Sequence, residues 1–305
     1  MRLFTNGIRF DEKTVAMLKK YDMNPQIVVS FDGVGTHDWM RGVEGAQKEA
    51  ERAIQLAVDE GFQVKANVNV NFKTAPNLTE TCKCLYRLGV RSIFFIRTSE
   101  APKWIRSGLP SLTAKEYWDA MLEVTKALRQ ENKRDLEFIW FNGPTIPAGV
   151  SAEEYGKGSS FQYQSGDICH SAWCFKAINA LYVSSTGRVM PCDGFEGMAL
   201  QKDWEPGRCN ILEMPLQQIL NGSAYADLMR LSTEELMEQL PECRGCEYEK
   251  RCHGGSCRAC GVLYKAVQNG FTFENLDVDM KLKSPLTCAF YKDGYYDRLI
   301  EILKE

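Results

Sequence analysis

The sequence predicts an α/β fold followed by a loop-rich segment full of cysteines, and two observations lead to this prediction. In the first half, short runs of β-branched residues alternate with amphipathic stretches at intervals of about 30–40 residues, the pattern of βαβ units on a parallel sheet. In the second half the regular patterns give way to loops, and ten of the 12 cysteines follow residue 168. The length of 305 residues allows one large domain or two medium ones.

Four strands and three helices are predicted in the first half. The strands are QIVVSF (26–31), QVKANVNVN (63–71), SIFFIR (92–97) and LEFIWF (136–141). The helices cover 43–61, 77–90 and 111–130, where apolar residues recur at helical spacing and Asn77 is placed to cap the second helix. A parallel sheet of this kind presents its ligand site at the carboxyl ends of the strands.

A Gly-, Pro- and Ser-rich stretch at 141–166 separates the halves, as a linker or as a long functional loop. We therefore expect one domain over 1–150 and a second over 151–305. The second contains a hairpin candidate at 180–192 that turns at Thr186-Gly187, and helical patterns at 233–240 and 295–305. Because so loop-rich a segment has few regular elements to bury, we expect metal sites to supply part of its stability.

Composition excludes several classes of protein. Lys and Arg number 37 against 40 Asp and Glu, for a net charge of -3, so the chain lacks the basic footprint of a nucleic-acid partner. No run approaches the roughly 18 apolar residues that cross a membrane. The start, MRLFTNGIRFDEKT, has no apolar core segment and does not read as a signal peptide. We therefore expect a cytoplasmic, reducing environment without membrane or nucleic-acid partners.

In a reducing compartment, clustered cysteines predict metal sites rather than disulfides. The spacing is Cys174-x12-Gly187-x4-Cys192, then Cys243-x2-Cys246-x5-Cys252-x4-Cys257, and finally Cys288, with Cys169 shortly before the first element. Eight thiolates suit two four-sulfur sites, because a four-thiolate zinc site and a [4Fe–4S] cluster each need four ligands.

This pattern resembles the SPASM domain, the auxiliary-cluster domain of radical S-adenosylmethionine (SAM) enzymes that modify peptides and proteins. That family's pattern is C-x9–15-G-x4-C, then C-x2-C-x5-C-x3-C, then a final C. The x3 spacing is x4 here, through CHGGSC (252–257), and Cys260 is an extra thiol, so either Cys257 or Cys260 is the eighth ligand. The resemblance implies one cluster on Cys169, Cys174, Cys192 and Cys257, and another on Cys243, Cys246, Cys252 and Cys288.

The first half resembles the radical SAM partial barrel. LFTNG (3–7) is similar to the end of a central strand, and VVSFDG (28–33) is similar to the next strand, whose Ser-x-Asp element lies near SAM in many members. Ser30 and Asp32 occupy those positions, and the polar strand NVNVN (67–71) follows at the right interval. The resemblance implies a partial (β/α) barrel and a cofactor site that includes Ser30 and Asp32.

The family's C-x3-C-x2-C triplet, which holds the catalytic cluster, is absent from these 305 residues. Cys82 and Cys84 form a C-x-C on a predicted helix and are read as ordinary thiols. A GGEP-like segment is missing too, so the resemblance implies a barrel without its first two βα units. The chain is either an N-terminally truncated copy, the interpretation we favour, or a natural remnant. We expect that it cannot cleave SAM alone.

The resemblance implies a radical SAM/SPASM maturase that oxidatively modifies a peptide or protein by hydrogen-atom abstraction. The product is formylglycine, as in anaerobic sulfatase-maturing enzymes, or a thioether or carbon–carbon crosslink, as in ribosomal-peptide maturases. The implied cofactors are two auxiliary [4Fe–4S] clusters, with SAM and a third [4Fe–4S] cluster in the complete enzyme. The implied partners are the substrate and an electron donor such as flavodoxin or ferredoxin.

Asp193 directly follows Cys192 and is the candidate catalytic residue. By resemblance it takes the proton that is released when the substrate radical is oxidised. The alternative is that it caps the turn CDGF (192–195). Two alternatives also stay open for the whole chain: a non-catalytic iron–sulfur module for electron transfer or binding, and a zinc-stabilised interaction domain.

Overall fold

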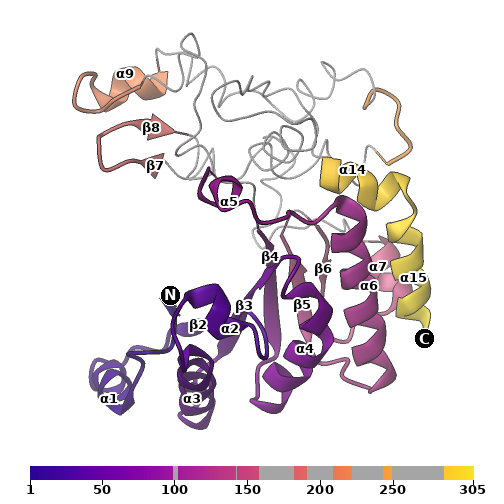
Figure 1. The fold of residues 1–305 in the computed structure, drawn as a ribbon, viewed down its shortest axis with the longest axis horizontal. Coiled ribbons are helices and arrows are strands. Elements are labelled where there is room, and N and C mark those ends of the chain that lie inside the picture. The colour runs from indigo at the N-terminus through magenta and orange to yellow at the C-terminus, as the bar shows by residue number, and fades with distance from the viewer. Residues whose placement is uncertain (99–101, 142, 158–181, 191–208, 222–242, 249–284) are drawn as a thin grey trace. The chain divides into compact units, whose positions relative to one another are not determined.

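The structure, a computed structural model of the chain, describes residues 1–98, 102–141, 143–157, 182–190, 209–221, 243–248 and 285–305 (Figure 1). The chain divides into two compact units. Unit 1 comprises Met1–Thr98, Ser111–Ser160 and Gly294–Glu305, and unit 2 comprises Ser99–Pro110 and Phe161–Asp293. The final segment thus belongs with the first part of the chain. The division at residue 150 that the sequence suggested stays a prediction.

Unit 1 is built on an open six-stranded sheet with the order β1-β2-β3-β4-β5-β6. The strands are β1 (Arg2–Thr5), β2 (Gln26–Ser30), β3 (Val64–Val70), β4 (Ser92–Arg97), β5 (Glu137–Trp140) and β6 (Thr145–Ile146). Strands β1 to β5 are parallel, and β6 runs antiparallel to β5. The predicted α/β class is confirmed, and the four predicted strands correspond to β2 to β5.

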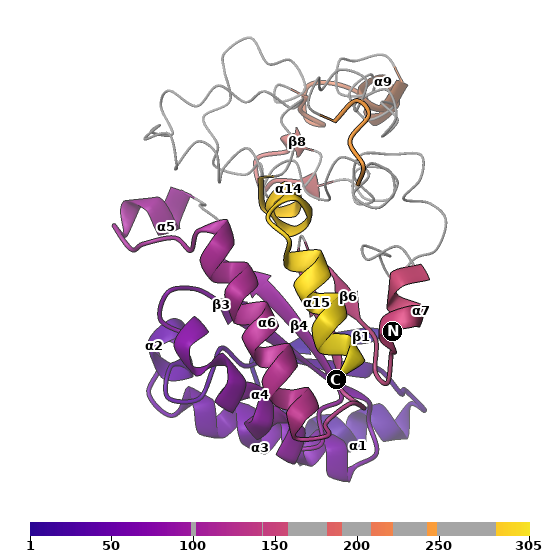
Figure 2. The same cartoon turned by 90° about the vertical axis from the view of Figure 1, so that its right-hand side faces the viewer.

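The helices of unit 1 lie between the parallel strands, except for the last two, which follow the sheet. They are α1 (Glu12–Lys20), α2 (His37–Arg41), α3 (Ala46–Asp59), α4 (Leu78–Arg87), α6 (Ala114–Gln130), α7 (Ala152–Lys157) and α15 (Tyr295–Lys304). A capping box fixes the start of α6, because Thr113 and Glu116 each bond the other's backbone N–H. Asn77 lies at the N-cap of α4, but its side chain makes no capping bond. Figure 2 shows α15 running beside α6.

The sheet has two different faces, which strand alternation and register define. The helix face carries Val64, Ala66, Val68 and Val70 of β3, in register with Ile93, Phe95 and Arg97 of β4. On this face Ala66, Val68, Ile93 and Phe95 are fully buried. The opposite side, here named the polar face, carries Ser30, Lys65, Asn67, Asn69, Ser92, Phe94, Ile96, Glu137 and Ile139. Most of these side chains are only partly buried.

The described part of unit 2 consists of short elements: α5 (Pro102–Arg106), β7 (Tyr182–Val183), β8 (Val189–Met190), α9 (Leu216–Asn221) and α14 (Pro285–Lys292). Strands β7 and β8 form the predicted hairpin. Gly187 turns it with a φ of +81°, and an added Cβ would lie 2.6 Å from Asn210 Oδ1. The Gly of the cysteine pattern is therefore required by backbone conformation and by close packing.

The rest of the sequence prediction for secondary structure has mixed outcomes. The C-terminal helical pattern is α15, whereas the helix expected at 233–240 lies outside the described residues. The stretch expected as a linker or loop contains β6 and α7. Within the part of the chain that the structure describes, no helix combines the length and apolar character needed to cross a membrane.

Candidate functional site

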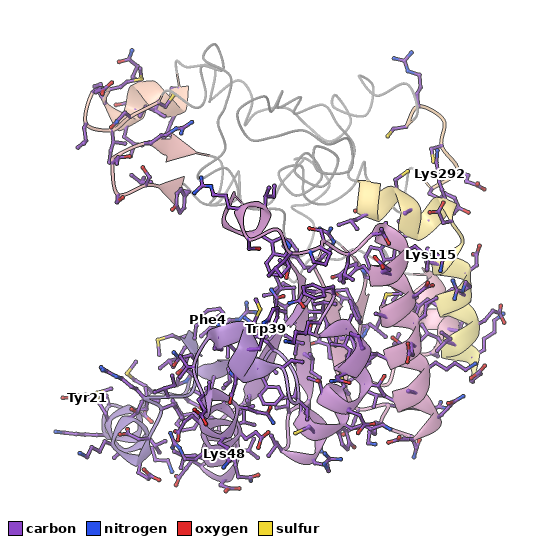
Figure 3. The ribbon with its side chains drawn as sticks, in the orientation of Figure 1. Phe4, Tyr21, Trp39, Lys48, Lys115 and Lys292 are labelled. Carbon is purple, nitrogen blue, oxygen red and sulfur yellow. The ribbon has the colours of Figure 1, made fainter. Side chains whose placement is uncertain are left out.

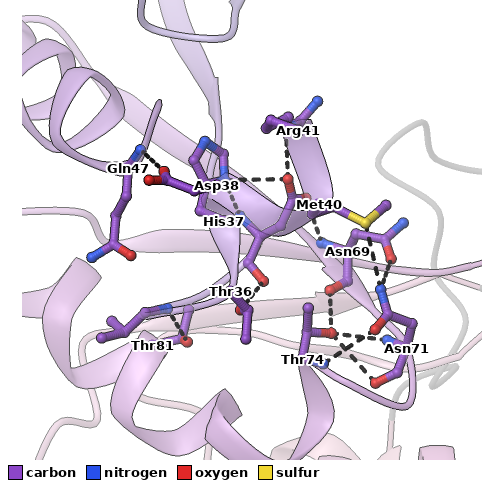
Figure 4. Close-up of polar contacts among 12 residues, drawn as sticks. Thr36, His37, Asp38, Met40, Arg41, Gln47, Asn69, Asn71, Thr74 and Thr81 are labelled. Carbon is purple, nitrogen blue, oxygen red and sulfur yellow. Dashed lines mark hydrogen bonds and ion pairs between the residues drawn. The ribbon is translucent and has the colours of Figure 1, made fainter. Parts of the chain in front are cut away.

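Ser30 ends β2, and Asp32 follows it at the carboxyl edge of the sheet, where parallel sheets bind ligands. The Asp32 side chain is 3% exposed, and its Oδ2 lies 2.6 Å from Arg41 Nε in an ion pair. Its Oδ1 accepts a hydrogen bond of 3.3 Å from the Asn69 backbone N–H (Figure 4). The Asp32 carboxylate therefore connects β2, α2 and β3, and its predicted place in a cofactor site stays a prediction.

His37 lies beneath this carboxylate and is completely buried. Its Nδ1 accepts a 2.9 Å hydrogen bond from the Asp32 backbone N–H, and its ring stacks on Phe31 with centroids 5.5 Å apart. The same Nδ1 lies 3.2 Å from Asp32 Oδ2, so the ring also contacts the carboxylate.

The turn between β2 and α2 is held by backbone and side-chain bonds. Gly33 has a φ of +129°, and an added Cβ would lie 2.5 Å from Thr36 Oγ1, so the position requires glycine. Asp38 of α2 accepts 2.7 Å hydrogen bonds from the backbone N–H groups of Gln47 and Gly45 at the start of α3. These two bonds, Gln47 first, lower the pKa of Asp38.

Polar side chains order the carboxyl end of β3 (Figure 4). Asn71 donates from Nδ2 to Asn69 Oδ1 at 3.0 Å, and Thr98 of the neighbouring strand end donates to the same oxygen. Thr74 Oγ1 donates to the Asn69 carbonyl at 2.8 Å, and the Asn71 side chain accepts from the Thr74 N–H at 3.1 Å. These hydrogen bonds orient the side chains at the strand end, which preorganises the groups around it.

Ser30 and Asn67 differ from these neighbours. They pair in register on the polar face of β2 and β3, and both are partly exposed. Neither side chain hydrogen-bonds to any described residue. Their hydroxyl and amide groups are thus available to a ligand on the polar face.

One row deeper on the polar face, Lys65, Ser92 and Glu137 lie in register across β3, β4 and β5. Lys65 is only 6% exposed, and its Nζ lies 5.5 Å from the ring centroid of Phe94. Ser92 Oγ donates to Glu137 Oε2 at 2.6 Å. Burial lowers the pKa of Lys65, and the Glu137 charge opposes that effect in part. We did not select Lys65 from the sequence. Lysines are rarely buried, so a lysine within a buried strand could have marked the position as unusual.

The predicted cluster ligands that the structure describes are Cys243, Cys246 and Cys288. The Cys246 N–H donates to the Cys243 carbonyl at 3.1 Å, which closes a tight turn around Gly245 with its φ of +73°. Just after this turn, Tyr248 stacks on Tyr291 of α14, with centroids 5.3 Å apart and ring planes inclined by 26°. Cys288 lies one helical turn before Tyr291, so the stack brings the turn against the helix that carries Cys288.

The other predicted ligands, Cys169, Cys174, Cys192, Cys252 and Cys257, lie outside the described residues, as do Asp193 and Cys260. Within the described ranges, no three His, Cys, Asp or Glu residues gather as a metal site.

Two cysteines outside the predicted sets have a structural role. Cys82 is fully buried in α4, where burial raises the pKa of its thiol. Cys209 packs with Val189 and Ile219 in a small core. Among the described residues, both pack as small apolar side chains.

Comparison with known families and structures shows which proteins this chain resembles. Residues 174–247 match the family model of the SPASM domain, described as an iron–sulfur cluster-binding domain. The match begins at Cys174 and includes Cys192, Cys243 and Cys246. The SPASM assignment made from cysteine spacing is confirmed. No curated protein matches the chain significantly in sequence.

Three solved structures are similar in fold. Native anSMEcpe with bound AdoMet has a TM-score of 0.63 and 18% identity, covering 99% of this chain and 73% of that one. Streptococcus suis SuiB bound to the precursor peptide SuiA has a TM-score of 0.57 and 15% identity, covering 94% and 58%. Streptococcus suis SuiB bound to S-adenosylmethionine has a TM-score of 0.55 and 13% identity, and the match covers 94% of this chain and 59% of that one. The chain thus spans about three-fifths to three-quarters of these proteins.

The chain therefore shares its fold, including an open sheet, with these three structures, and residues 174–247 match the SPASM domain. The resemblance to radical SAM/SPASM enzymes is confirmed. At these identities the likeness establishes the fold, and the reaction and its substrate are inferred below.

Proposed function

We propose that this chain is the SPASM-bearing part of a radical SAM maturase that oxidatively modifies a peptide or protein. The SPASM match over residues 174–247, joined to a radical SAM sheet, carries the proposal. The SuiB structure with its precursor peptide supports a peptide substrate. When bound, SAM and a reduced cluster supply a radical that abstracts a hydrogen atom, and the auxiliary clusters supply an acceptor for the substrate's electron.

The described residues are compatible with the cluster that the family resemblance implies on Cys243, Cys246, Cys252 and Cys288. Cys243 and Cys246, at the two ends of the turn, are both partly exposed. The stack of Tyr248 on Tyr291 brings this turn against α14, the helix that carries Cys288. Cys252 follows the turn closely in sequence and completes four thiolates, the number a [4Fe–4S] cluster needs. Cys169, Cys174, Cys192 and Cys257 are proposed for the other cluster.

On the polar face, Ser30 and Asn67 offer hydrogen-bonding groups to a bound nucleoside ligand, and Asp32 holds the turn beside them. Asp193 accepts the proton that leaves the oxidised substrate carbon. Formylglycine formation and thioether or carbon–carbon crosslinking both use such a proton acceptor, and the Cys192-Asp193 pair favours formylglycine. We also propose that a donor such as flavodoxin or ferredoxin supplies the electrons and that the protein is cytoplasmic.

The catalytic cluster needs a C-x3-C-x2-C element from outside these residues, because the 305 residues contain none. The sheet supports this requirement. Strand β1 has one neighbour among the described strands, and Phe4 on it is 67% exposed (Figure 3). An exposed strand edge with an apolar side chain is suited to pair with a further strand. An in-frame C-x3-C-x2-C upstream of Met1 in the DNA supports truncation, and its absence favours the non-catalytic iron–sulfur module.

Metal analysis of the chain, purified without oxygen, tests the function directly. Two [4Fe–4S] clusters correspond to about eight irons and eight sulfides per chain, with absorption near 400 nm. Cys288→Ser is expected to remove about half of the iron, because one cluster loses a ligand. Cys84→Ser is the matched control, since Cys84 is a half-buried thiol on α4 outside both predicted sets. Two zinc ions without iron contradict the proposal and favour the zinc-stabilised interaction domain.

A further inference from the structure

A cavity with two arginines in its wall lies in unit 1, away from the candidate cofactor site. It has a volume of about 520 Å³ and is lined by the end of α6, the segment between β6 and α7, and α15. Helix α15 packs against both α6 and α7 (Figure 2). All the lining residues belong to unit 1. A concave site of this size can hold a small organic molecule.

The cavity lies at the amino edge of the sheet. Arg134, one of its lining residues, precedes β5, whereas Asp32 follows the end of β2, and these strands run parallel. Gly149 and Ser151 also line the cavity, and they follow β6, which runs antiparallel to β5 and returns to the same edge. The cavity and Asp32 therefore lie at opposite edges of the sheet, so a ligand in the cavity is separate from the proposed cofactor.

Two guanidinium groups of the lining have many unused hydrogen-bond donors. Arg129 is half-buried, and its Nη2 and Nη1 donate to the backbone carbonyls of Val150 at 2.5 Å and Leu303 at 3.4 Å. Arg134 donates from Nη2 to the backbone oxygen of Glu305 at 2.7 Å. Neither arginine forms an ion pair with a side-chain carboxylate of the described residues. Because a guanidinium carries five N–H groups, most of these donors have no acceptor in the described part of the chain.

The two arginine charges also act on each other. Burial, and then the charge of Arg134, lower the pKa of Arg129. Even where the Glu305 oxygen belongs to a terminal carboxylate, it bonds to Arg134 alone and leaves Arg129 with neutral carbonyls. An anion in the cavity would remove the repulsion and supply acceptors for the unused N–H groups.

The other charged residues of the lining indicate the size of the anion. Glu153 pairs with Lys157, and Lys304 pairs with Glu301 at 2.6 Å. These exposed pairs are balanced, so the described rim is not the broad basic surface that attracts an acidic protein. The unbalanced charge is confined to the two arginines in the wall of the cavity. This arrangement favours a small anion over a macromolecule.

Three apolar side chains, here named the apolar wall, line the same cavity: Val150, Ile300 and Leu303. A guanidinium bonds two oxygens of a phosphate side by side, and the three oxygens of a phosphate monoester can serve two guanidinium groups. We propose that the cavity binds the phosphate group of a small organic phosphate monoester at Arg129 and Arg134, with its organic part on the apolar wall. The inference is independent of the proposed function, because the cavity contains none of the residues proposed for cofactors.

Calorimetric titration of the anaerobically purified chain tests this assignment, with phenyl phosphate, inorganic phosphate and hexaglutamate as probes. Phenyl phosphate is expected to bind saturably and more tightly than the other two. Arg134→Met should weaken its binding by about tenfold, because charge-assisted hydrogen bonds are lost. Arg129→Lys keeps the charge without the planar fork and should retain part of the affinity. Lys126→Met is the matched control and should change nothing, since Lys126 is an exposed lysine on α6 outside the lining.

Arg134→Met is the principal variant, because Arg134 is exposed, whereas Arg129 also joins α6 to α15 through Leu303. Thermal unfolding of the ligand-free variants separates a loss of affinity from a loss of folding, and Arg129→Lys decides the matter if Arg134→Met does not fold. The inference is overturned by no saturable binding, by equal affinity for phenyl phosphate and inorganic phosphate, or by unchanged affinity in Arg134→Met and Arg129→Lys. Tighter binding of hexaglutamate than of phenyl phosphate also overturns it and favours an acidic protein segment as the ligand.

Discussion

The two faces of the sheet in unit 1 come from the same strands and yet have opposite character. In β3, Ala66 and Val68 point to the helix face and are completely buried, whereas Asn67 and Asn69 point to the polar face and are partly exposed. Parallel sheets that are covered on both sides read as nearly continuous apolar runs. A strand with asparagines at every second position therefore indicates that one face is reserved for a ligand rather than for core packing.

The largest difference between the faces should appear on truncation of a large side chain. Phe95 on the helix face is fully buried and stacks on Trp140 with centroids 4.0 Å apart. Phe95→Ala leaves a cavity in this core and is expected to lower the free energy of unfolding by about 3–5 kcal/mol. Denaturant titration followed by circular dichroism measures the loss.

Asn67→Ala is the matched change on the polar face, two strand positions from the row of Lys65. Because the Asn67 side chain bonds to no described residue, its loss should cost under about 0.5 kcal/mol. If Phe95→Ala and Asn67→Ala lower the free energy of unfolding by similar amounts, the distinction between a core face and a ligand face is contradicted.

The ion pair at the edge of the polar face should give an intermediate effect. Asp32→Asn keeps the size of the side chain and the bond from the Asn69 N–H but removes the charge beside Arg41. Since Arg41 is partly exposed, the expected loss is about 1–3 kcal/mol. Asp59→Asn, at an exposed carboxylate on α3, is the control and should change stability little. Equal stability of both variants shows that Asp32 does not hold the turn.

Lys65→Met should act in the opposite direction and stabilise the ligand-free chain, by about 1–2 kcal/mol at neutral pH. The pKa of Lys65 is lowered in the folded state, so folding penalises its charged form. That penalty is complete below the folded pKa and disappears as the pH rises through it toward the unfolded value. The gain from Lys65→Met should therefore shrink in alkaline solution, as thermal unfolding at several pH values can measure. A destabilised variant would mean that Lys65 serves the core.

Sequence patterns predicted the regular part of unit 1 well, because the strands and helices there carry strong apolar periodicity. The runs at 26–31 and 92–97 match β2 and β4 within one residue. The two-residue strand β6 and the helix α7 were missed, since a stretch rich in Gly and Pro gives no periodic signal. The hairpin around Gly187 was found because glycine at a turn is a local requirement.

The candidate site was predicted less completely than the fold. Ser30 and Asp32 were identified by resemblance, but the contacts of Asp32 with Arg41 and with Asn69 join segments far apart in sequence. No local pattern reports such contacts. The row of Lys65, Ser92 and Glu137 likewise depends on the strand register across β3, β4 and β5.

A crystal structure of the anaerobically purified chain with S-adenosylhomocysteine tests the central claim most directly, because it locates the ligand relative to both faces. We predict the nucleoside on the polar face, within hydrogen-bond distance of Ser30 and Asn67. A ligand bound away from the polar face would contradict the account.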